Sequence, residues 1–336
     1  MKKALVFGAT GQLGSAAIEH LLQSGWRVTA VTHARPEHLP ATVETIVAGG
    51  KSRAQIIQNL GQTFDAVFEP TAYSDADAND LLEASSLYDS IVVVSSCSVY
   101  ADEQGRSLDE ASINRFPEFS APMTEATATV APGPETYSTR KVAMENVFRA
   151  SKVPITILRP CAIYGRNSTH PREWWLIKRA LDGRKQIPVA YYGKSIFHTS
   201  SAKGIASLVE ICMLNPAQRI LNVADSKPLT VIQIAAVLQE ATNLQINMHP
   251  FAGQPAGHIG SSPWSTPRPY VIDCTAAKAL GWDGGEEYPV AVKNLTKWLL
   301  TFRHNPNWIE QLKSFAHYKN DPFDYAGEDA WLLRNS

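Results

Sequence analysis

The sequence predicts a doubly wound α/β fold, with a parallel sheet in the first part of the chain and a smaller C-terminal lobe. Over the first 160 residues, short apolar runs alternate with helix-like segments, as they do when crossover helices connect parallel strands. Residues 91–94 are four consecutive apolar residues, which suits a strand covered on both faces. Beyond residue 160 the alternation is less regular, and Pro- and Gly-containing loops separate the expected helices.

The expected elements follow in order along the chain. Apolar, mostly β-branched runs predict strands at residues 4–7, 28–32, 43–47, 65–68, 91–94 and 155–158. Helical patterning predicts helices at residues 12–23, 54–60, 76–87, 137–150, 174–181, 202–214, 231–239 and 290–302. The tail from residue 303 is rich in aromatic residues, so we expect it to be ordered. Packing on the body is its favoured role, ahead of contacting a second subunit or covering the site.

The composition is that of an ordinary globular protein: 44% hydrophobic residues, 19% charged residues and a net charge of −1. This balance gives no reason to expect nucleic acid or a membrane as a partner. No apolar run approaches the roughly 18 residues of a membrane-spanning helix. The four cysteines are widely spaced and lack zinc-ligand spacing, so we expect no metal site, free thiols and a reducing cytoplasmic location.

A glycine-rich turn connects the first strand to the first helix. Glycine allows positive φ and lets the backbone approach a ligand, and the following helix directs N–H groups and partial positive charge toward a pyrophosphate. A tight turn without a ligand has the same residue types, but the strand–turn–helix context favours a dinucleotide. The residues expected to hold it are Gly8, Thr10, Gly11, Gln12, Leu13 and Gly14.

The end of the second strand bears on which dinucleotide is bound. An acid there would accept the ribose hydroxyls of NAD and repel the extra phosphate of NADP. The chain instead has Thr32, His33, Ala34 and Arg35, with no acid before Glu37. We expect Arg35, helped by His33, to bind the 2′-phosphate, so NADP is preferred over NAD.

A tyrosine and a lysine four residues apart supply a candidate proton-transfer pair. Tyr137 and Lys141 lie on one face of the expected helix. A free phenol has a pKa of about 10, so base catalysis at neutral pH needs roughly 4 kcal/mol of preferential phenolate stabilisation. The lysine ammonium and an oxidised nicotinamide supply part of it, and both residues would also contact the cofactor. A third group is expected among the serine hydroxyls after the strand at 91–94, at Ser95, Ser96 or Ser98.

Across approximately residues 3–300, the chain resembles the extended short-chain dehydrogenase/reductase family, also called NAD-dependent epimerases/dehydratases. The resemblance selects Ser96 as the catalytic serine, four residues before Tyr100. It also implies a homodimer built through helices that flank the sheet, including the Tyr137 helix. The segments that carry the resemblance are the glycine turn, residues 95–100, 123–125, 137–141, 158–165, 273 and 280–282.

Several positions depart from what the resemblance implies for a nucleotide-sugar enzyme. Ala162 replaces the family's asparagine, and Lys194 stands where a diphosphate-binding arginine is expected. Ser200 and Ser201 replace an acidic pair, and residues 49–51 lack the expected adenine-side acid. These departures weaken the case for a UDP-sugar substrate more than the case for hydride chemistry.

The expected organisation has three parts. Residues 1–160 form a dinucleotide-binding Rossmann domain, to which residues 196–224 return; residues 161–195 and 225–302 form a substrate-binding lobe; residues 303–336 form the tail. The predicted function is NAD(P)-dependent hydride transfer at a secondary alcohol or ketone, of a sugar-like small molecule. Tyr137 is the acid/base, Lys141 lowers its pKa and holds the cofactor ribose, and Ser96 positions the substrate oxygen. Two alternatives remain: an NADPH-dependent reductase of a non-sugar carbonyl, and a non-catalytic NAD(P)-sensing interaction protein.

Overall fold

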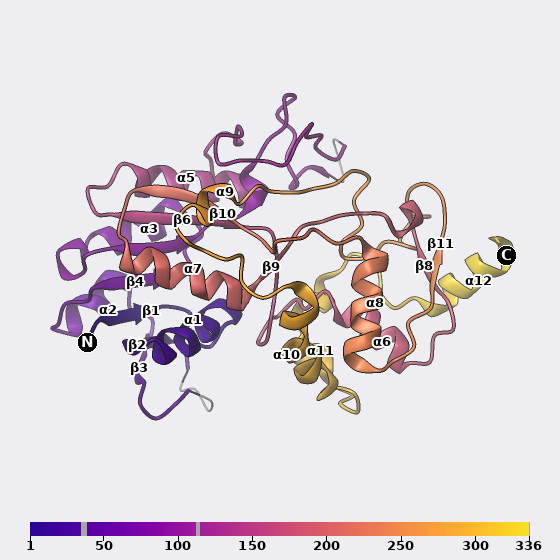
Figure 1. The fold of residues 1–336 in the computed structure, drawn as a ribbon, viewed down its shortest axis with the longest axis horizontal. Helices are drawn as coiled ribbons and strands as arrows, with labels where there is room; N and C mark the ends of the chain where they lie inside the picture. Colours follow the sequence, from indigo (N-terminus) through magenta and orange to yellow (C-terminus); the bar gives the residue numbers. More distant parts are fainter. Residues whose placement is uncertain (35–38, 112–114, 336) are drawn as a thin grey trace. The chain divides into compact units, whose positions relative to one another are not determined.

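The computed structural model describes residues 1–34, 39–111 and 115–335, and the chain divides into two compact units (Figure 1). The first unit comprises residues 1–161, 202–224 and 272–285. The second comprises residues 162–201, 225–271 and 286–336. Each unit has its own hydrophobic core.

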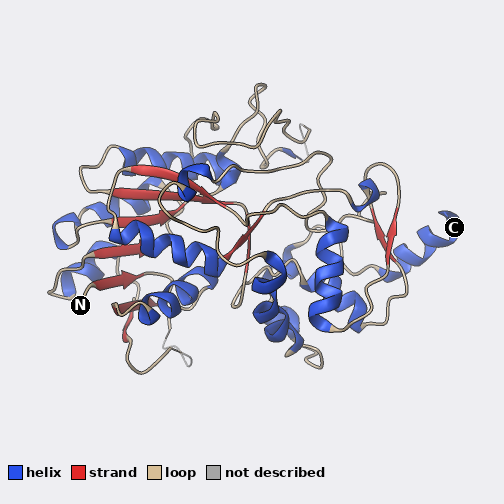
Figure 2. Cartoon of the chain, in the orientation of Figure 1, coloured by secondary structure: helices blue, strands red, loops and turns tan. Residues whose placement is uncertain are grey.

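Within the described residues, seven parallel strands form the central sheet of the first unit, in the order β10-β6-β5-β4-β1-β2-β3 (Figure 2). The strand order reverses between β1 and β4, which is where ligands bind in doubly wound sheets, beyond the carboxyl ends of the strands. This topology confirms the predicted fold class. The strands are β1 (Lys3–Val6), β2 (Arg27–Thr32), β3 (Glu44–Val47), β4 (Ala66–Glu69), β5 (Ile91–Val94), β6 (Ile155–Pro160) and β10 (Arg219–Val223).

Helices flank the sheet because its strands are apolar on both sides. Side chains alternate along a strand, so Leu5, Val67 and Val93 share a face and pack in one core cluster with residues of α2, α3 and α5. Ala4 and Val92, one residue out of step, are equally buried on the opposite face. There α1 and α7 pack along each other. The flanking helices are α1 (Gln12–Gln23), α2 (Arg53–Asn59), α3 (Asp75–Leu82), α5 (Tyr137–Arg149) and α7 (Ala202–Leu214).

The predicted elements of the first unit are confirmed with ends shifted by one or two residues, except in α3. The sequence predicts a helix to residue 87, but α3 ends at Leu82 and a short 3₁₀ helix, η1 (Ser85–Leu87), follows. The hydroxyl of Tyr88 donates to the carbonyl oxygen of Leu81 over 2.8 Å. This buried hydrogen bond satisfies a helix-terminal carbonyl and accompanies the turn toward β5.

The second unit is mainly helical, and the tail belongs to its core. Leu312 and Phe315 are buried in the same cluster as Trp174 and Trp175, so this part of the tail packs within the second unit. Two short parallel pairs, β7 (Ala162–Tyr164) with β9 (Thr199–Ser201) and β8 (Ile187–Val189) with β11 (Met248–Pro250), were not predicted, because strands of three residues have little periodicity. The helices are α6 (Trp174–Leu181), α8 (Val231–Thr242), α10 (Tyr288–Leu300), α11 (Trp308–Gln311), η4 (Lys313–His317) and α12 (Tyr325–Asn335).

The residue boundaries of the two units differ from those of the expected domains. Residues 202–224 belong to the first unit, whereas 196–201 belong to the second. Residues 272–285, expected in the substrate lobe, belong to the first unit. There Ile272 forms a parallel bridge with Met123, and the side chain of Asn222 on β10 donates to the carbonyl oxygens of Met123 and Asp273. The functional roles assigned to the domains stay a prediction.

All four cysteines lie in the described part of the chain, where they are buried and form no disulfide. None of the helices in the described part of the chain combines the length and the apolar character needed to cross a membrane.

Candidate active site

The glycine turn after β1 is closely packed against the segment that follows β4. Gly8 has φ +59°, and a Cβ atom on it would lie 2.5 Å from Cγ2 of Thr71. A Cβ atom on Gly14 would collide with the carbonyl oxygen of Gly8. Both positions therefore require glycine, for backbone conformation at one and for close approach at the other.

The same turn presents the N-terminal end of α1 at the carboxyl edge of the sheet. Gly11 is the N-cap residue, and no side chain caps the helix. Gly11 and Thr10 are exposed, Gln12 is half-buried, and Leu13 and Gly14 are buried. A tight turn leading into a helix end without a side-chain cap fits a pyrophosphate, because backbone N–H groups and the helix dipole favour an anion there.

The end of β2 is described only as far as Ala34. His33 and Ala34 are exposed just beyond the strand, and no carboxylate occurs between Thr32 and Ala34. The proposed phosphate-binding Arg35 lies outside the described residues.

The catalytic helix candidate, α5, begins at Tyr137 because a capping box fixes its start. The Thr136 side chain accepts from the backbone N–H of Thr139, and the Thr139 side chain accepts from the backbone N–H of Thr136. Tyr137 thus occupies the first helical position and keeps 39% of its surface exposed. Lys141 lies one turn later and is only 1% exposed.

Two backbone carbonyls at the ends of neighbouring strand segments hold Lys141. Its Nζ donates to the carbonyl oxygen of Ala72 over 2.6 Å and to that of Val94 over 2.8 Å. An ammonium has three donors, so one remains beyond these two bonds. Burial is the main influence on this group and lowers the pKa of Lys141 to about 8, against the opposing effect of Glu69 and Glu145.

Of the three candidate serines, Ser96 lies beside the phenol of Tyr137. Burial raises the pKa of Tyr137 well above its usual value, while a side-chain hydrogen bond with Ser96 opposes that rise. The Oγ of Ser98 instead pairs with the Oγ of Ser138 over 2.9 Å. The Oγ of Ser95 is buried and finds no hydrogen-bond partner among the described residues. Ser96 also caps a short 3₁₀ helix, η2 (Cys97–Val99), by accepting from the Ser98 N–H over 3.1 Å.

Tyr73, which is not among the predicted site residues, lies against both members of the tyrosine–lysine pair. The Nζ of Lys141 is 4.5 Å from the centroid of the Tyr73 ring. The Tyr73 and Tyr137 rings are 6.2 Å apart and tilted by 55°. Tyr73 belongs to no sequence motif. What could have pointed to it in the sequence is its position just beyond β4, at the carboxyl edge of the sheet.

A buried ion pair supports α5 from the neighbouring strand. The guanidinium of Arg159 on β6 donates to both carboxylate oxygens of Glu145, one turn beyond Lys141. The same guanidinium lies 4.9 Å from the ring of Tyr100. Removing one partner of such a pair would leave an uncompensated buried charge, so the pair links α5 to β6.

In the second unit, His198, Ser200 and Ser201 at the nucleotide-sugar positions are buried, whereas Lys194 is not. His198 is buried and its Nε2 lies 2.8 Å from the carbonyl oxygen of Asp225. The Ser201 N–H donates to the carboxylate of Asp225 over 3.0 Å, and Ser200 is fully buried. Burial raises the pKa of Asp225 to about 7. Lys194 is exposed.

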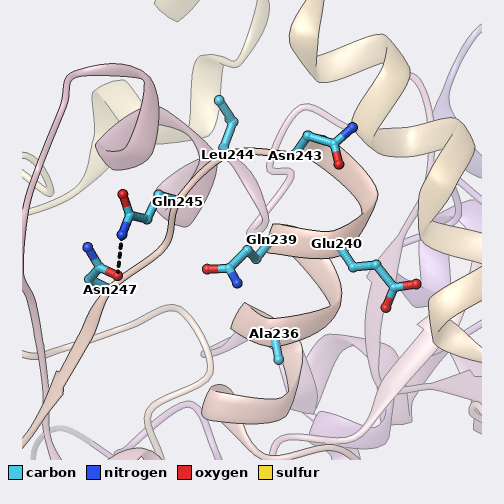
Figure 3. A pocket seen from close by; sticks show the side chains of 7 residues that line it. All are labelled: Ala236, Gln239, Glu240, Asn243, Leu244, Gln245 and Asn247. Atoms are coloured by element: carbon cyan, nitrogen blue, oxygen red, sulfur yellow. Dashed lines mark hydrogen bonds between the residues drawn. The ribbon is translucent and has the colours of Figure 1, made fainter.

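A shallow hollow of about 690 Å³ lies in the second unit at the C-terminal end of α8 (Figure 3). Amide side chains dominate its lining, and Gln245 donates to Asn247 on one side of it. None of the predicted site residues lines it. It gives no support to a catalytic role at this end of the unit.

Comparisons with known proteins agree with the fold and with the resemblance. The UDP-glucuronic acid 4-epimerase of Bacillus cereus, solved with UDP-glucuronic acid and NAD, is 17% identical, with a TM-score of 0.65 over 89% of this chain and 99% of that one. The UDP-N-acetylglucosamine 4-epimerase of Bacillus cereus is 19% identical, with a TM-score of 0.67 over 90% and 97%. The dTDP-glucose 4,6-dehydratase of Bacillus anthracis str. Ames, solved with NAD, is 14% identical, with a TM-score of 0.65 over 93% and 100%.

These identities are low enough that the likeness shows the fold alone. No curated protein matches the chain. Residues 4–224, which include the glycine turn and the Ser96, Tyr137 and Lys141 segments, match the model of the NAD dependent epimerase/dehydratase family. With the seven-stranded parallel sheet in place, this match over most of the chain shows that the protein belongs to the NAD dependent epimerase/dehydratase family of enzymes.

Proposed function

We propose that the protein transfers a hydride at a secondary alcohol or ketone of a sugar-like substrate, using NAD(P) and the set Ser96, Tyr137 and Lys141. The observation that carries the proposal is the gathering of these three side chains beyond β5 and on α5, at the sheet edge that also holds the glycine turn. A sugar-like substrate is supported by structures of the same fold that were solved with UDP-glucuronic acid and UDP-glucose.

The roles of the three side chains follow from their chemistry. A bound nicotinamide would supply the hydride acceptor or donor. In the oxidative direction the Tyr137 phenolate takes the proton of the substrate hydroxyl, and in the reductive direction the phenol returns a proton to the alkoxide. Ser96 donates a hydrogen bond to the substrate oxygen. Lys141 stabilises the phenolate and offers its remaining N–H to the cofactor ribose.

Lowering the pKa of Tyr137 is the main electrostatic task of this site. Burial, with smaller contributions from Tyr73, Cys97 and Asp109, holds that pKa above its usual value, so the phenolate forms only when positive charge is added nearby. The Lys141 ammonium and the oxidised nicotinamide are the two charges that the proposal assigns to this purpose.

Replacing Tyr137 with Phe tests the acid/base assignment. We expect turnover to fall by roughly 10² to 10⁴, the range for loss of a general acid–base, with dinucleotide affinity nearly unchanged. Turnover would be followed with a panel of nucleotide sugars and simple ketones, and affinity by calorimetry. Tyr192→Phe, at an exposed tyrosine of the second unit, is the matched control. Undiminished turnover in Tyr137→Phe would refute the assignment.

For the cofactor, we propose NADP over NAD. The described end of β2 has no carboxylate to repel a 2′-phosphate, and Arg35 follows it in the sequence. The named complexes of the same fold contain NAD, so NAD is the direct competitor. Ala34→Asp should weaken NADP binding by like-charge repulsion and leave NAD binding similar or stronger, as measured by the two dissociation constants. Equal affinity of the unmodified protein for both dinucleotides would contradict the NADP preference.

A reductase of a non-sugar carbonyl is the second candidate. The burial of His198 and Ser200, the hydrogen bond of His198 to the backbone of Asp225, and alanine at position 162 favour a substrate without a nucleotide diphosphate. Stoichiometric consumption of NADPH would identify a reductase, whereas an epimerase returns the hydride and shows no net consumption. Mass spectrometry of a co-purified ligand would name the substrate class. Tight dinucleotide binding without turnover on either panel would instead favour an NAD(P)-sensing interaction protein.

We also propose a homodimer in the cytoplasm. The exposed residues of α5 and the near-neutral charge are compatible with self-association. Light scattering of the purified protein gives its mass directly, and fractionation of cells that produce it gives its location. A monomeric mass at micromolar concentration, or recovery outside the cytoplasm, would contradict these two proposals.

A further inference from the structure

We propose that Tyr73 is a positioning residue of the proton-transfer site, and that its ring face holds the ammonium of Lys141 beside Tyr137. The inference rests on the proposed function, because it assigns Tyr73 to the service of the same lysine. It adds to the site a residue that lies outside the sequence motifs of Ser96, Tyr137 and Lys141.

The geometry places the Tyr73 ring beside the ammonium, in addition to its hydrogen-bond acceptors. Nζ of Lys141 has two carbonyl acceptors, on Ala72 and Val94, and the ring centroid lies 4.5 Å away. The Tyr137 ring is farther from the same nitrogen, at 5.7 Å. A cation within about 6 Å of an aromatic centroid is attracted by the negative ring face.

The start of α3 fixes where Tyr73 lies. Its backbone N–H donates to the carboxylate of Asp77 over 2.8 Å, and the same carboxylate completes the capping box of Ser74. The backbone carbonyl of the preceding residue, Ala72, binds Lys141. Thus the segment that supplies a hydrogen-bond acceptor to the ammonium also supplies the ring.

Charged groups of four neighbouring elements act on Lys141, and they oppose one another. Glu69 on β4, Glu145 on α5 and Asp77 on α3 favour the ammonium, while Arg53 on α2 disfavours it. Arg53 itself pairs with Glu69 over 2.7 Å and with Asp77 over 2.8 Å. Glu145 is similarly paired with Arg159. The nearby carboxylates are therefore largely compensated, which leaves room for a neutral aromatic face to stabilise the buried charge.

This arrangement matters because burial brings the pKa of Lys141 close to the working range. Near pH 8 a lysine of this kind is divided between its charged and neutral forms. A neutral lysine cannot stabilise the Tyr137 phenolate. Each interaction that favours the ammonium form of Lys141 therefore helps the site to work. Tyr73 is 51% exposed, so its ring can be altered without opening the core.

A pair of variants with the same ring size isolates the ring face. Tyr73→Phe removes only the hydroxyl and keeps the negative face. A protein with 4-cyanophenylalanine at position 73 keeps an aromatic ring over Lys141, but the electron-withdrawing cyano group reduces the negative potential of the ring face. The full-length protein would be labelled with ¹⁵N-lysine and the Lys141 side-chain signal titrated with pH, assigned by its loss in Lys141→Met. Circular dichroism melting would confirm that each variant is folded.

We expect the titration midpoint of Lys141 to change little in Tyr73→Phe and to fall by about half a pKa unit to one unit in the 4-cyanophenylalanine protein. Equal midpoints in all three proteins would overturn the proposal. A fall in Tyr73→Phe as large as in the 4-cyanophenylalanine protein would also overturn it, because the hydroxyl would then be responsible. The titration needs neither substrate nor turnover, so its result is distinguishable from failure of the proposed function, which Tyr137→Phe tests.

Discussion

At the scale of single residues, the environment of Lys141 sets the chemistry that the site supports. A buried ammonium with two carbonyl acceptors is held in place, but it also loses hydration, which lowers its pKa to about 8. The contacts of each hydroxyl likewise distinguish Ser96 from Ser95 and Ser98. Residue type and spacing select the candidates, and the contacts then distinguish among them.

Turnover should decline as pH rises through about 8, because deprotonation of Lys141 removes the charge that supports the Tyr137 phenolate. The lysine is charged below this value and neutral above it, so the loss lies on the alkaline side. A pH profile of kcat in Lys141→Met should show turnover at least tenfold lower, without this alkaline decline. Lys152→Met, at an exposed lysine shortly after α5, is the control and should keep the profile. A Lys141→Met profile parallel to that of the unmodified protein would remove the lysine from the mechanism.

At the scale of elements, the junction of β1 and α1 requires close backbone approach. The segment at Gly14 runs so near the carbonyl of Gly8 that no side chain fits between them. The capping boxes of α3 and α5 fix where those helices start, and thereby place Tyr73 and Tyr137. Local sequence signals of this kind are readable in advance because they act over three or four residues.

Gly14→Ala should therefore reduce both stability and dinucleotide affinity. We expect a loss of about 1–3 kcal/mol in the free energy of unfolding, from overpacking against the Gly8 carbonyl. Gly25→Ala is the matched control: its φ of +80° makes alanine strained, but nothing lies within 4 Å of the added Cβ. It should lower stability without changing affinity, as measured by urea unfolding and calorimetry. Unchanged dinucleotide affinity in Gly14→Ala would argue against a cofactor at this turn.

At the scale of the whole molecule, contacts between residues far apart in the sequence hold each unit together. In the second unit, the guanidinium of Arg179 on α6 donates to the carboxylate of Glu328 on α12 over 2.6 Å, and both side chains are buried. The same guanidinium lies 3.6 Å from the centroid of the Trp175 ring. These contacts attach the end of the tail to the unit's helical core.

Glu328→Ala should destabilise the second unit by roughly 3–5 kcal/mol, because it leaves Arg179 buried without its carboxylate partner. Thermal melting and limited proteolysis of the tail would measure the effect. Asp329→Ala removes a more exposed partner of Arg184 and should cost about 1 kcal/mol or less. Similar melting temperatures for the two variants would contradict an anchoring role for the Arg179–Glu328 pair.

The sequence by itself determined the features that depend on neighbouring residues. These are the parallel-strand runs, the Gly8–Gly14 turn, the helical face shared by Tyr137 and Lys141, and the presence of serines after β5. Only the tertiary structure decided that the Tyr73 ring lies on Lys141, 68 positions along the chain, and that Arg179 pairs with Glu328. The physical reason is that turns, caps and helical spacing are set by local backbone geometry, whereas pairing across long sequence separations depends on how strands and helices pack.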